Sequence, residues 1–384
     1  MKITGIICEY NPLHLGHKKQ IDTIREINGA DSAIVCLMSG NFVQRGSPAI
    51  VDKVRRAKAA IACGADLVLE LPVIYALSSA EGFAAGGVGI LSGICDELCF
   101  GAETDDAQAL LSIARALLSE DFPQALKAQL AKGLSFPAAR EAALVAMGYD
   151  AVLLRLPNNI LAVEYCKAII AQGSSLTPMP ILREGGYHDV LPDPQNPSAT
   201  AVRALMAGSD WKNFVPRQTL ACFEDAPLHT LAAGERAILA RLRTMTDGEF
   251  ESLPYGSEGL WRKLMHEARQ KATVEEILSA VKSKRYTRTR LDRMLMCAFL
   301  GIRENDLKQE IPYVRILALN DRGRQVLKQG HSPVPLINIG QSMDHPYTDL
   351  EKRCDDLYGL FCVDIPEPPG ANAAYRVYYQ GGTL

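Results

Sequence analysis

Short apolar runs alternate with amphipathic stretches over the first hundred residues of the chain. The strand-like runs are 3–8, 32–38, 66–71 and 97–100, and the stretches with apolar residues at helical spacing are 17–27 and 51–63. Strands that alternate with helices predict an α/β fold built on a doubly wound parallel sheet. Ligands bind such sheets at the carboxyl ends of the strands, so those ends are where a functional site is expected.

Helical patterns dominate the middle of the chain. The segment 105–147 is rich in Ala and Leu without strand signals, and further helices are expected at 159–171 and 199–207. A strand is predicted at 179–182. A polar loop rich in Gly, His and Pro follows at 184–197.

A domain boundary is expected near residue 215, where a polar turn around Pro216 precedes a change to helical patterning rich in Leu, Arg and Glu. The region 228–302 reads as all-helical. Strand-like runs return after Pro312, which would let the tail pack back on another domain. The predicted parts are a doubly wound α/β domain at 1–215, a mainly helical region at 216–310, and a small α/β module or extension at 311–384.

Composition indicates an ordinary globular protein. Of 384 residues, 48% are hydrophobic and 22% are charged, which favours neither disorder nor a membrane protein. The longest apolar stretch, 75–94, is interrupted by Glu81 and is no bilayer span. The first apolar run meets Glu9 too early for a signal peptide, so a cytoplasmic protein is expected. The ten Cys are scattered, and only Cys95 and Cys99 are closely spaced, so no metal site or disulfide framework is predicted.

The segment His14-Leu15-Gly16-His17 stands where the first strand passes into the first helix. Backbone N–H groups and the helix dipole favour anions at such a place. Two imidazoles can donate hydrogen bonds to the charge that develops on an α-phosphate during nucleotidyl transfer. Gly16, without a Cβ, would let phosphates approach the backbone. The alternative is a pair of ordinary loop or metal-binding histidines.

The string Asn11-Pro-x-His-x-Gly-His17 resembles the signature of the HIGH-type superfamily, which holds class I aminoacyl-tRNA synthetases and nucleotidylyltransferases. Longer segments resemble one branch, the bacterial tRNA(Met) cytidine acetate ligases. These segments are Gly5-Ile-Ile-Cys-Glu-Tyr-Asn-Pro-Leu-His-Leu-Gly-His17, Met38-Ser-Gly-Asn-Phe-Val-Gln-Arg-Gly46, Asp66-Leu-Val-Leu-Glu-Leu-Pro72, Phe100-Gly-Ala-Glu103, Pro157-Asn-Asn-Ile-Leu161, Tyr187-His-Asp189, Ser198-Ala-Thr-Ala-Val-Arg203 and Lys282-Ser-Lys-Arg-Tyr-Thr-Arg-Thr-Arg290. They occur in the same order over most of residues 1–302, and the match beyond 310 is much weaker.

The resemblance implies a HIGH-type, Rossmann-like nucleotidyltransferase domain and a two-step ligase reaction. Acetate and ATP, with Mg²⁺, give acetyl-adenylate and pyrophosphate. The acetyl group then passes to N4 of the wobble cytidine of elongator tRNA(Met), giving N4-acetylcytidine. The implied partners are therefore tRNA and acetate, with neither DNA nor a membrane.

The resemblance also assigns site residues, with His14 and His17 as the catalytic pair. The implied ATP-binding residues are Ile7, Cys8, Glu9, Tyr10, Asn11, Pro12, Leu13, His14, Leu15, Gly16, His17, Lys18, Lys19, Gln20, Gly101, Asn158, Arg183, Ser198, Thr200 and Arg203. The last three belong to a second phosphate motif, whose usual second hydroxyl residue is here Ala199.

Most of these positions also have simpler interpretations. Ser198 is a plausible helix N-cap, and Asn158 could cap another helix. Gly101 could merely end a strand. Arg183 could be a surface charge. The cluster Tyr187-His188-Asp189 fits a loop hydrogen-bond network as well as a substrate contact, and the loop 39–46 fits a carboxylate pocket as well as a plain connection.

A concentration of cations follows residue 281. This basic segment comprises Lys282, Lys284, Arg285, Tyr286, Arg288, Arg290 and Arg293. Its six cations face one acid in the sequence, Asp292, although the chain as a whole has a net charge of −3. Such a segment can neutralise RNA phosphates, and Tyr286 adds a stacking surface. A solvated basic helix is the alternative.

Three functions remain open on the residues alone. The first is the RNA-modifying ligase. The second is a small-molecule adenylyltransferase or pantothenate-synthetase-like ligase, which would need the histidine motif but not the basic segment. The third is a non-catalytic nucleotide-binding RNA protein, against which the paired histidines speak, since binding alone does not require transition-state donors.

Overall fold

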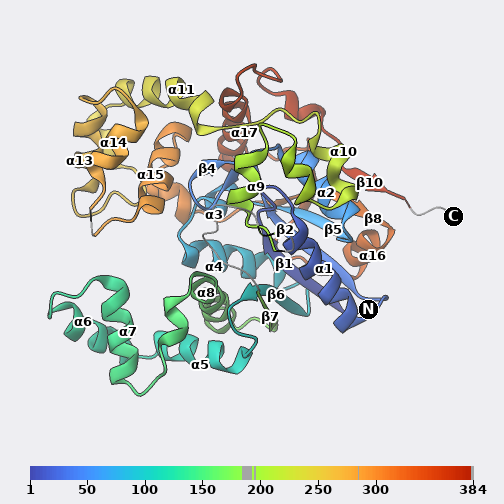
Figure 1. The fold of residues 1–384 in the computed structure, drawn as a ribbon, viewed down its shortest axis with the longest axis horizontal. Coiled ribbons are helices and arrows are strands. Elements are labelled where there is room, and N and C mark those ends of the chain that lie inside the picture. The colour runs from blue at the N-terminus through green and yellow to red at the C-terminus, as the bar shows by residue number, and fades with distance from the viewer. Residues whose placement is uncertain (184–192, 194–195, 284, 382–384) are drawn as a thin grey trace.

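A mostly parallel sheet forms the centre of the computed structural model, which describes residues 1–183, 193, 196–283 and 285–381 (Figure 1). The cluster Tyr187-His188-Asp189 and Lys284 of the basic segment lie outside the described residues. The strands are β1 (Ile3–Cys8), β2 (Ala33–Ser39), β5 (Leu67–Leu71), β6 (Glu97–Ala102), β7 (Thr177–Leu182), β8 (Val314–Asn320), β9 (Leu336–Asn338) and β10 (Tyr378–Gln380). They follow the order β10-β8-β5-β2-β1-β6-β7, with β9 paired to β8.

Strand β1 is the point where the order of the sheet reverses. It pairs in parallel with β2 on one side and with β6 on the other. Connections therefore leave in opposite directions from this strand, and a crevice opens at its carboxyl end. The predicted doubly wound sheet is confirmed, and the histidine motif lies at its switch point.

Alternate residues of the inner strands pack into two different cores. Val35 and Leu37 of β2 belong to one core, whereas Ile34 and Cys36 belong to the other. Both faces of a parallel sheet are covered by helices, and this explains why the strands read as continuous apolar runs. Helices α4 (Ala80–Leu91), α5 (Ala107–Leu118) and α8 (Pro157–Ala171) cover the first face, and α1 (Leu15–Asn28) and α2 (Lys53–Ala62) cover the second.

A helical region follows, as predicted, and has a core of its own. It contains α11 (Leu231–Thr244), α12 (Asp247–Glu251), α13 (Leu260–Ala268), α14 (Val274–Val281) and α15 (Arg288–Leu300). Its buried side chains also contact Phe42, Val73 and Ile74 of the first part of the chain. In Figure 1 this region projects from the sheet on the same side as the smaller lobe of α6 (Phe122–Leu130) and α7 (Phe136–Ala146).

The chain after residue 310 returns to the main sheet. Strand β8 pairs antiparallel with β5, and β10 pairs in parallel with β8. Helix α17 (Pro346–Tyr358) packs in the core of the helical region. The predicted division at 215 and 310 stays a prediction, although its third part shares its sheet with the first. In the described part of the chain, no helix is long and apolar enough to cross a membrane.

Candidate active site

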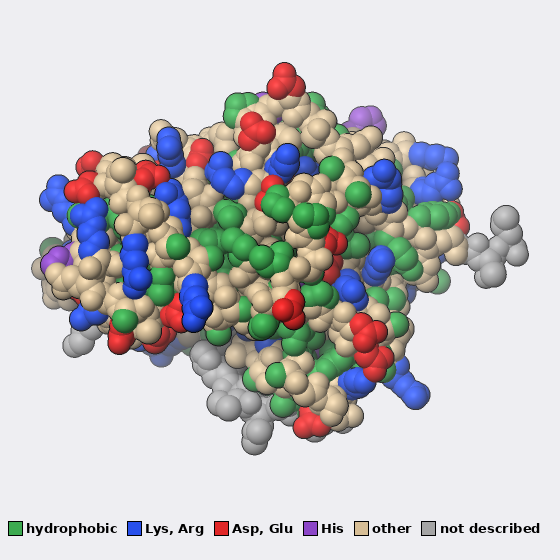
Figure 2. Space-filling model, turned by 90° about the horizontal axis from the view of Figure 1, so that it is seen from above, with side chains coloured by type: hydrophobic (Ala, Val, Ile, Leu, Met, Phe, Trp, Pro, Cys, Tyr) green, Lys and Arg blue, Asp and Glu red, His purple; other side chains and the backbone are tan. Residues whose placement is uncertain are grey.

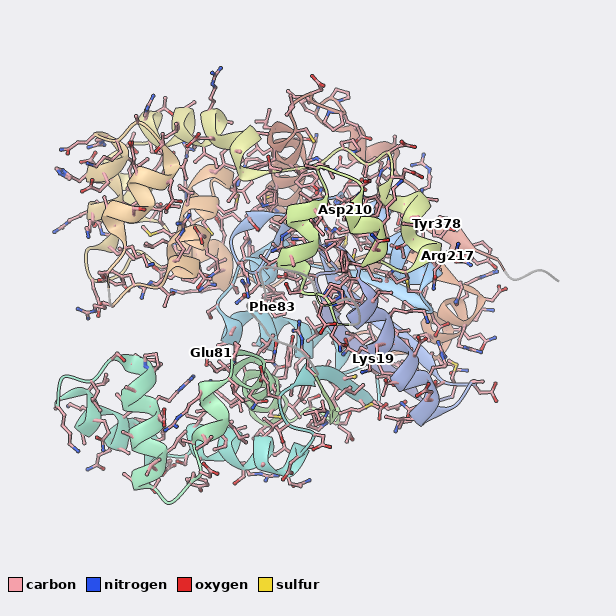
Figure 3. All side chains as sticks on the ribbon, in the orientation of Figure 1. Lys19, Glu81, Phe83, Asp210, Arg217 and Tyr378 are labelled. Carbon is pink, nitrogen blue, oxygen red and sulfur yellow. The ribbon has the colours of Figure 1, made fainter. Side chains whose placement is uncertain are left out.

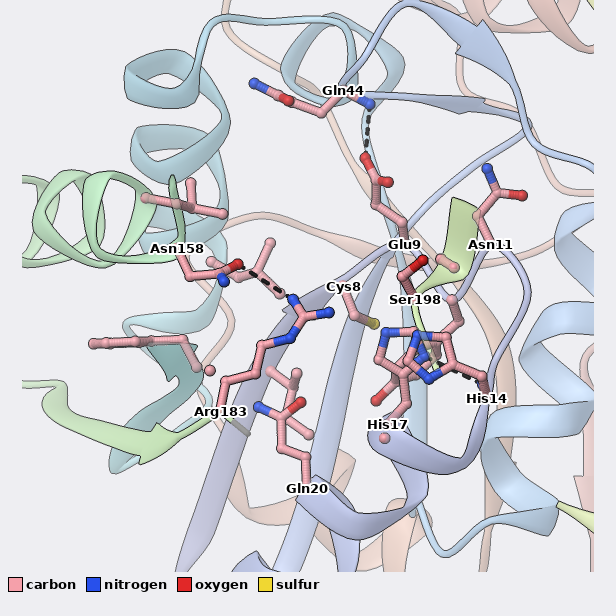
Figure 4. A pocket seen from close by; sticks show the side chains of 18 of the residues that line it. Cys8, Glu9, Asn11, His14, His17, Gln20, Gln44, Asn158, Arg183 and Ser198 are labelled. Atoms are coloured by element: carbon pink, nitrogen blue, oxygen red, sulfur yellow. Dashed lines mark hydrogen bonds between the residues drawn. The ribbon is translucent and has the colours of Figure 1, made fainter. Parts of the chain in front are cut away.

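A cavity of about 350 Å³ opens at the carboxyl ends of β1 and β6 (Figure 4). Helix α1 contributes Lys19 to its wall and α4 contributes Phe83 (Figure 3). The implied ATP-binding residues that line it are Ile7, Cys8, Glu9, Tyr10, Asn11, His14, Gly16, His17, Lys19, Gln20, Gly101, Asn158, Arg183, Ser198, Thr200 and Arg203. Segments almost 200 residues apart in the sequence therefore meet around one space.

Four residues of the predicted set do not line this cavity: Pro12, Leu13, Leu15 and Lys18. The side chain of Leu13 is fully buried in the core against α1 and α2. That of Lys18 pairs with Asp22, one turn further along α1. A contiguous stretch cannot present all its side chains to one ligand, because successive side chains point in different directions both in a helix and in an extended segment.

His14 and His17 stack on each other at the start of α1. Their ring centroids are 3.7 Å apart, with an interplanar angle of 24°. The backbone N–H of His14 donates to Nδ1 of His17 at 3.3 Å. The ring of Tyr10 packs edge-on against His17, with centroids 5.0 Å apart. Both imidazoles are thereby held in fixed orientations at the helix N-terminus.

Burial keeps both imidazoles neutral at pH 7. Burial and the nearby Arg183 cation lower the pKa of His17 to about 3. Burial, the His17 ring and the cations Arg183 and Arg203 hold the pKa of His14 well below its usual value. A neutral His17 whose Nδ1 accepts a hydrogen bond carries its proton on Nε2 and can donate from there. Nδ1 of His14 is buried without a hydrogen-bond partner among the described residues.

The loop before α1 is fixed by contacts from two distant segments. The side-chain oxygen of Asn11 accepts the N–H of Ile50 at 2.7 Å. The backbone oxygen of Asn11 accepts from Nη1 of Arg203 at 2.8 Å, and Nη2 of Arg203 donates to Oγ1 of Thr200 at 3.0 Å. Ser198 caps α9 (Ala199–Leu205) by accepting the N–H of Ala201. The capping interpretation of Ser198 is therefore confirmed, and the residue lines the cavity as well.

Arg183 and Asn158 meet on the opposite wall of the cavity (Figure 4). Nη1 of Arg183 donates to the amide oxygen of Asn158 at 3.3 Å, and the amide nitrogen of Asn158 donates to Glu103 at 2.7 Å. Helix α8 begins at Pro157, so Asn158 lies inside it and is not its N-cap. Glu103 instead accepts the N–H groups of Asn158 and Asn159.

Two glycines limit the shape of the cavity. A Cβ on Gly101 would meet no atom within 4 Å, so this position faces open space where a ligand can approach the backbone. A Cβ on Gly16 would lie 3.1 Å from Cε1 of His14. Gly16 therefore also leaves room for the stacked imidazole, a reason that the sequence motif does not reveal.

Comparison with known proteins agrees with this geometry. The model of the family HIGH Nucleotidyl Transferase matches residues 1–367. The tRNA(Met) cytidine acetate ligase of Clostridium novyi (strain NT) is 40% identical over 349 residues, which cover 86% of this chain and 87% of the relative. That of Acetivibrio thermocellus is 38% identical, covering 93% and 91%. The chain belongs to the tRNA(Met) cytidine acetate ligase family.

Solved structures of this family have the same fold. Apo TmcAL of Thermotoga maritima superposes with a TM-score of 0.90 at 29% identity, and each chain covers 100% of the other. The same protein bound with alpha-thio ATP superposes with a TM-score of 0.88 at 28% identity, again with full coverage of both chains.

The loop 39–46, which the sequence left open between a carboxylate pocket and a plain connection, brings Gln44 and Arg45 to the cavity from the hairpin of β3 (Phe42–Val43) and β4 (Ser47–Pro48). The sequence did not single out the apolar residues of the cavity. An apolar wall is built from strand and helix residues, namely Phe83, Phe100, Leu161, Tyr165, Ile181 and Leu182. A position near a strand end was the available signal for Phe100, Ile181 and Leu182, whereas the other three lie inside α4 and α8 and carried no such signal. Asn41 of the same loop does not line this cavity, because it hydrogen bonds to Lys53 and Asp355.

One member of the basic segment is largely buried. The side chain of Arg293 is only 8% exposed. It packs on the ring of Tyr255 and donates from Nη1 to the backbone oxygen of Gln44 at 3.3 Å. Its core position on α15 and its contact to the hairpin give Arg293 a packing role, and its assignment as an RNA-binding residue stays a prediction.

Two acids outside the basic segment, Glu258 and Glu275, also approach it. Arg285 pairs with Glu258, and Arg288 pairs with both Glu275 and Asp292. Over the helical region, Figure 2 shows Lys and Arg side chains interspersed with Asp and Glu. The local positive charge is thus smaller than the sequence indicates. Lys282 is exposed at the end of α14.

Proposed function

We propose that this protein is an ATP-dependent ligase that activates acetate as acetyl-adenylate and transfers the acetyl group to N4 of the wobble cytidine of elongator tRNA(Met). The observation that carries this proposal is the pair of stacked, neutral histidines in the cavity at the switch point of the sheet. Four cationic residues, Lys19, Arg45, Arg183 and Arg203, line the same cavity and match the charge of a triphosphate. The relatives named above, aligned over most of the chain, support the substrate class.

In the first step, a carboxylate oxygen of acetate forms a bond to the α-phosphorus of ATP, and the bond from that phosphorus to the bridging oxygen breaks. Pyrophosphate leaves with the electron pair. We propose that His14 and His17 donate hydrogen bonds to the α-phosphate oxygens as charge develops on them. Fixed neutral donors in a buried site stabilise such charge without reorganising during the reaction.

The remaining assignments belong to the same proposal. Arg183 and Arg203 would hold the phosphates. The guanidinium of Arg183 is oriented by its hydrogen bond to the amide oxygen of Asn158, and that of Arg203 by its hydrogen bond to the backbone oxygen of Asn11. Gly101 would let the nucleotide approach β6. Magnesium would arrive with ATP and bind its phosphate oxygens, since no group of three or more His, Cys, Asp or Glu able to hold a metal exists among the described residues. A cytoplasmic location fits a tRNA substrate.

The decisive experiment is ATP–pyrophosphate exchange, with and without acetate. We expect exchange that depends on acetate and needs no RNA. Enzyme and tRNA(Met) are then incubated either with labelled acetate and ATP, or with labelled acetyl-CoA without ATP. Label should enter cytidine in the first tube alone. Exchange with another small acid but not acetate would favour a small-molecule ligase, and equal labelling from acetyl-CoA would refute the adenylate mechanism.

A further inference from the structure

Glu9 is an unusual residue for a site that receives a triphosphate. Among the described residues that line the cavity, it is the one with a carboxylate. It follows β1 directly and shares the cavity with Lys19, Arg45, Arg183 and Arg203. A negative charge close to polyphosphate opposes nucleotide binding. ATP recognition alone therefore does not explain a carboxylate at this position.

Glu9 is held in place by one contact to its side chain and one to its backbone. One carboxylate oxygen, Oε1, accepts the backbone N–H of Gln44 at 2.8 Å (Figure 4). The backbone oxygen of Glu9 accepts from Nη1 of Arg56 at 2.6 Å. Arg56 is fully buried, and its guanidinium also bonds the carbonyl oxygens of Ser39 and Val51. A carboxylate can accept several hydrogen bonds, so the contact to Gln44 leaves capacity for a substrate donor.

The contact to Gln44 also relates Glu9 to the helical region. The backbone oxygen of Gln44 accepts from Arg293 of α15 at 3.3 Å. The same hairpin packs on α15 at Gly46, where φ is +79° and a Cβ would lie 2.3 Å from the backbone nitrogen of Arg293. Glu9 therefore lies at the wall of the cavity that adjoins the helix carrying part of the basic segment.

The second step of the proposed reaction needs a proton acceptor. The exocyclic amine of cytosine loses one proton when it becomes an amide. The two histidines are poorly suited to accept it. Burial holds the pKa of His14 well below its usual value, and Nδ1 of His17 is already a hydrogen-bond acceptor in a ring whose pKa burial lowers to about 3. Carboxylates are also the side chains that accept hydrogen bonds from cytosine N4 in nucleic-acid recognition.

We infer that Glu9 accepts a hydrogen bond from N4 of the target cytidine and takes its proton during acetyl transfer, which rests on the proposed function. In this step N4 forms a bond to the acetyl carbonyl carbon. The bond between that carbon and the phosphate oxygen breaks, and AMP leaves with the electron pair. The proton from N4 passes to the Glu9 carboxylate and then to water. Glu9 thus recognises the base and assists its reaction through one contact.

The test uses the full-length enzyme and separates the two steps. Glu9→Gln keeps an oxygen that can accept the Gln44 N–H but removes the charge. A general base typically contributes about 10²–10⁴ in rate, so single-turnover transfer from preformed acetyl-adenylate to tRNA should fall at least about 100-fold. Because Glu9 also lines the ATP cavity, acetate-dependent pyrophosphate exchange is measured on the same variant and should fall at least about tenfold less than transfer does. Glu9→Asp keeps the charge at a shorter reach and should transfer faster than Glu9→Gln.

Glu26→Gln is the matched control, because Glu26 is exposed on α1 and does not line the cavity. Both steps should stay within about twofold of the unchanged enzyme, as is usual for surface substitutions. Transfer by Glu9→Gln within tenfold of the original rate would overturn the inference. So would an equal loss of exchange and transfer, or a Glu9→Asp enzyme no faster than Glu9→Gln. If the enzyme without any substitution showed no acetate-dependent exchange, that result would instead refute the proposed function.

Discussion

Lys53 and Asp355 form a buried ion pair across 302 positions of the sequence. Nζ of Lys53, at the start of α2, lies 2.8 Å from Oδ2 of Asp355 on α17. The same ammonium lies 2.8 Å from Oε1 of Glu70 on β5. Arg315 of β8 pairs with Glu351 and Asp355 and completes the network. The tail of the chain is thereby joined to the nucleotide-binding sheet by charges as well as by β8.

Lys53→Met should destabilise the protein strongly. The substitution leaves Glu70 and Asp355 buried without their common cation, and breaking a buried pair typically costs about 3–5 kcal/mol. Urea unfolding measures the loss. Lys308→Met is the control, since Lys308 pairs with Glu304 on the surface and such a pair contributes at most about 1 kcal/mol. Equal effects of the two substitutions would contradict the importance of the buried network.

His14→Ala and His17→Ala should each slow adenylate formation by about 10²–10³, the usual cost of removing one transition-state donor. Acetate-dependent pyrophosphate exchange at saturating ATP measures the effect, and circular dichroism checks the fold. The exposed His266 on α13 provides a control, because His266→Ala should not alter exchange. Near-normal exchange in both cavity variants would remove the catalytic assignment.

The stability of the free protein should depend on pH through His17. Its folded-state pKa is about 3, below the ordinary value of 6.5, so the unfolded chain binds more protons between those values. Stability therefore falls as the pH drops from 6.5 towards 3. In His17→Gln, the free energy of unfolding should decline less between about pH 6.5 and 4.5 than in the original protein. Parallel declines would show that His17 is not buried as a neutral ring.

Gly101→Ala should weaken ATP binding without unfolding the protein. The new methyl would meet no protein atom within 4 Å but would occupy the space beside β6. We expect a loss of roughly tenfold in ATP affinity by calorimetry, about 1.4 kcal/mol, with little change in melting temperature. Gly248→Ala is the control, because Gly248 is equally open but lies on α12, away from the cavity.

Charge reversal at Lys282 and Arg285 should weaken tRNA binding more than it affects pyrophosphate exchange. Removing phosphate contacts lowers affinity and reduces the dependence of binding on salt by about one unit of slope per contact. Filter binding over a range of salt concentrations measures both. Arg293→Ala should behave differently, with a loss of stability, because Arg293 is buried against Tyr255. An unchanged salt dependence would remove Lys282 and Arg285 from the RNA interface.

The amino-acid sequence by itself determined the strands of the parallel sheet and the histidine motif between β1 and α1. These are local features. Continuous apolar runs specify buried parallel strands, and four consecutive positions from His14 to His17 suffice to place two imidazoles on one helix turn. The motif is also adjacent to the strand that becomes the switch point, so its place at the edge of the sheet could be predicted.

The tertiary structure decided how distant side chains join that motif. Asn158, Arg183 and Arg203 were assigned through the family resemblance, but no local pattern around them encodes the strand order that brings them, with Gln44, to the same edge of the sheet. Glu258 and Glu275 neutralise cations that appear unopposed in the sequence. Burial lowers the pKa of His17, and the packing of α15 encloses Arg293. Desolvation and long-range pairing depend on the folded surroundings of a side chain, which its sequence neighbours do not specify.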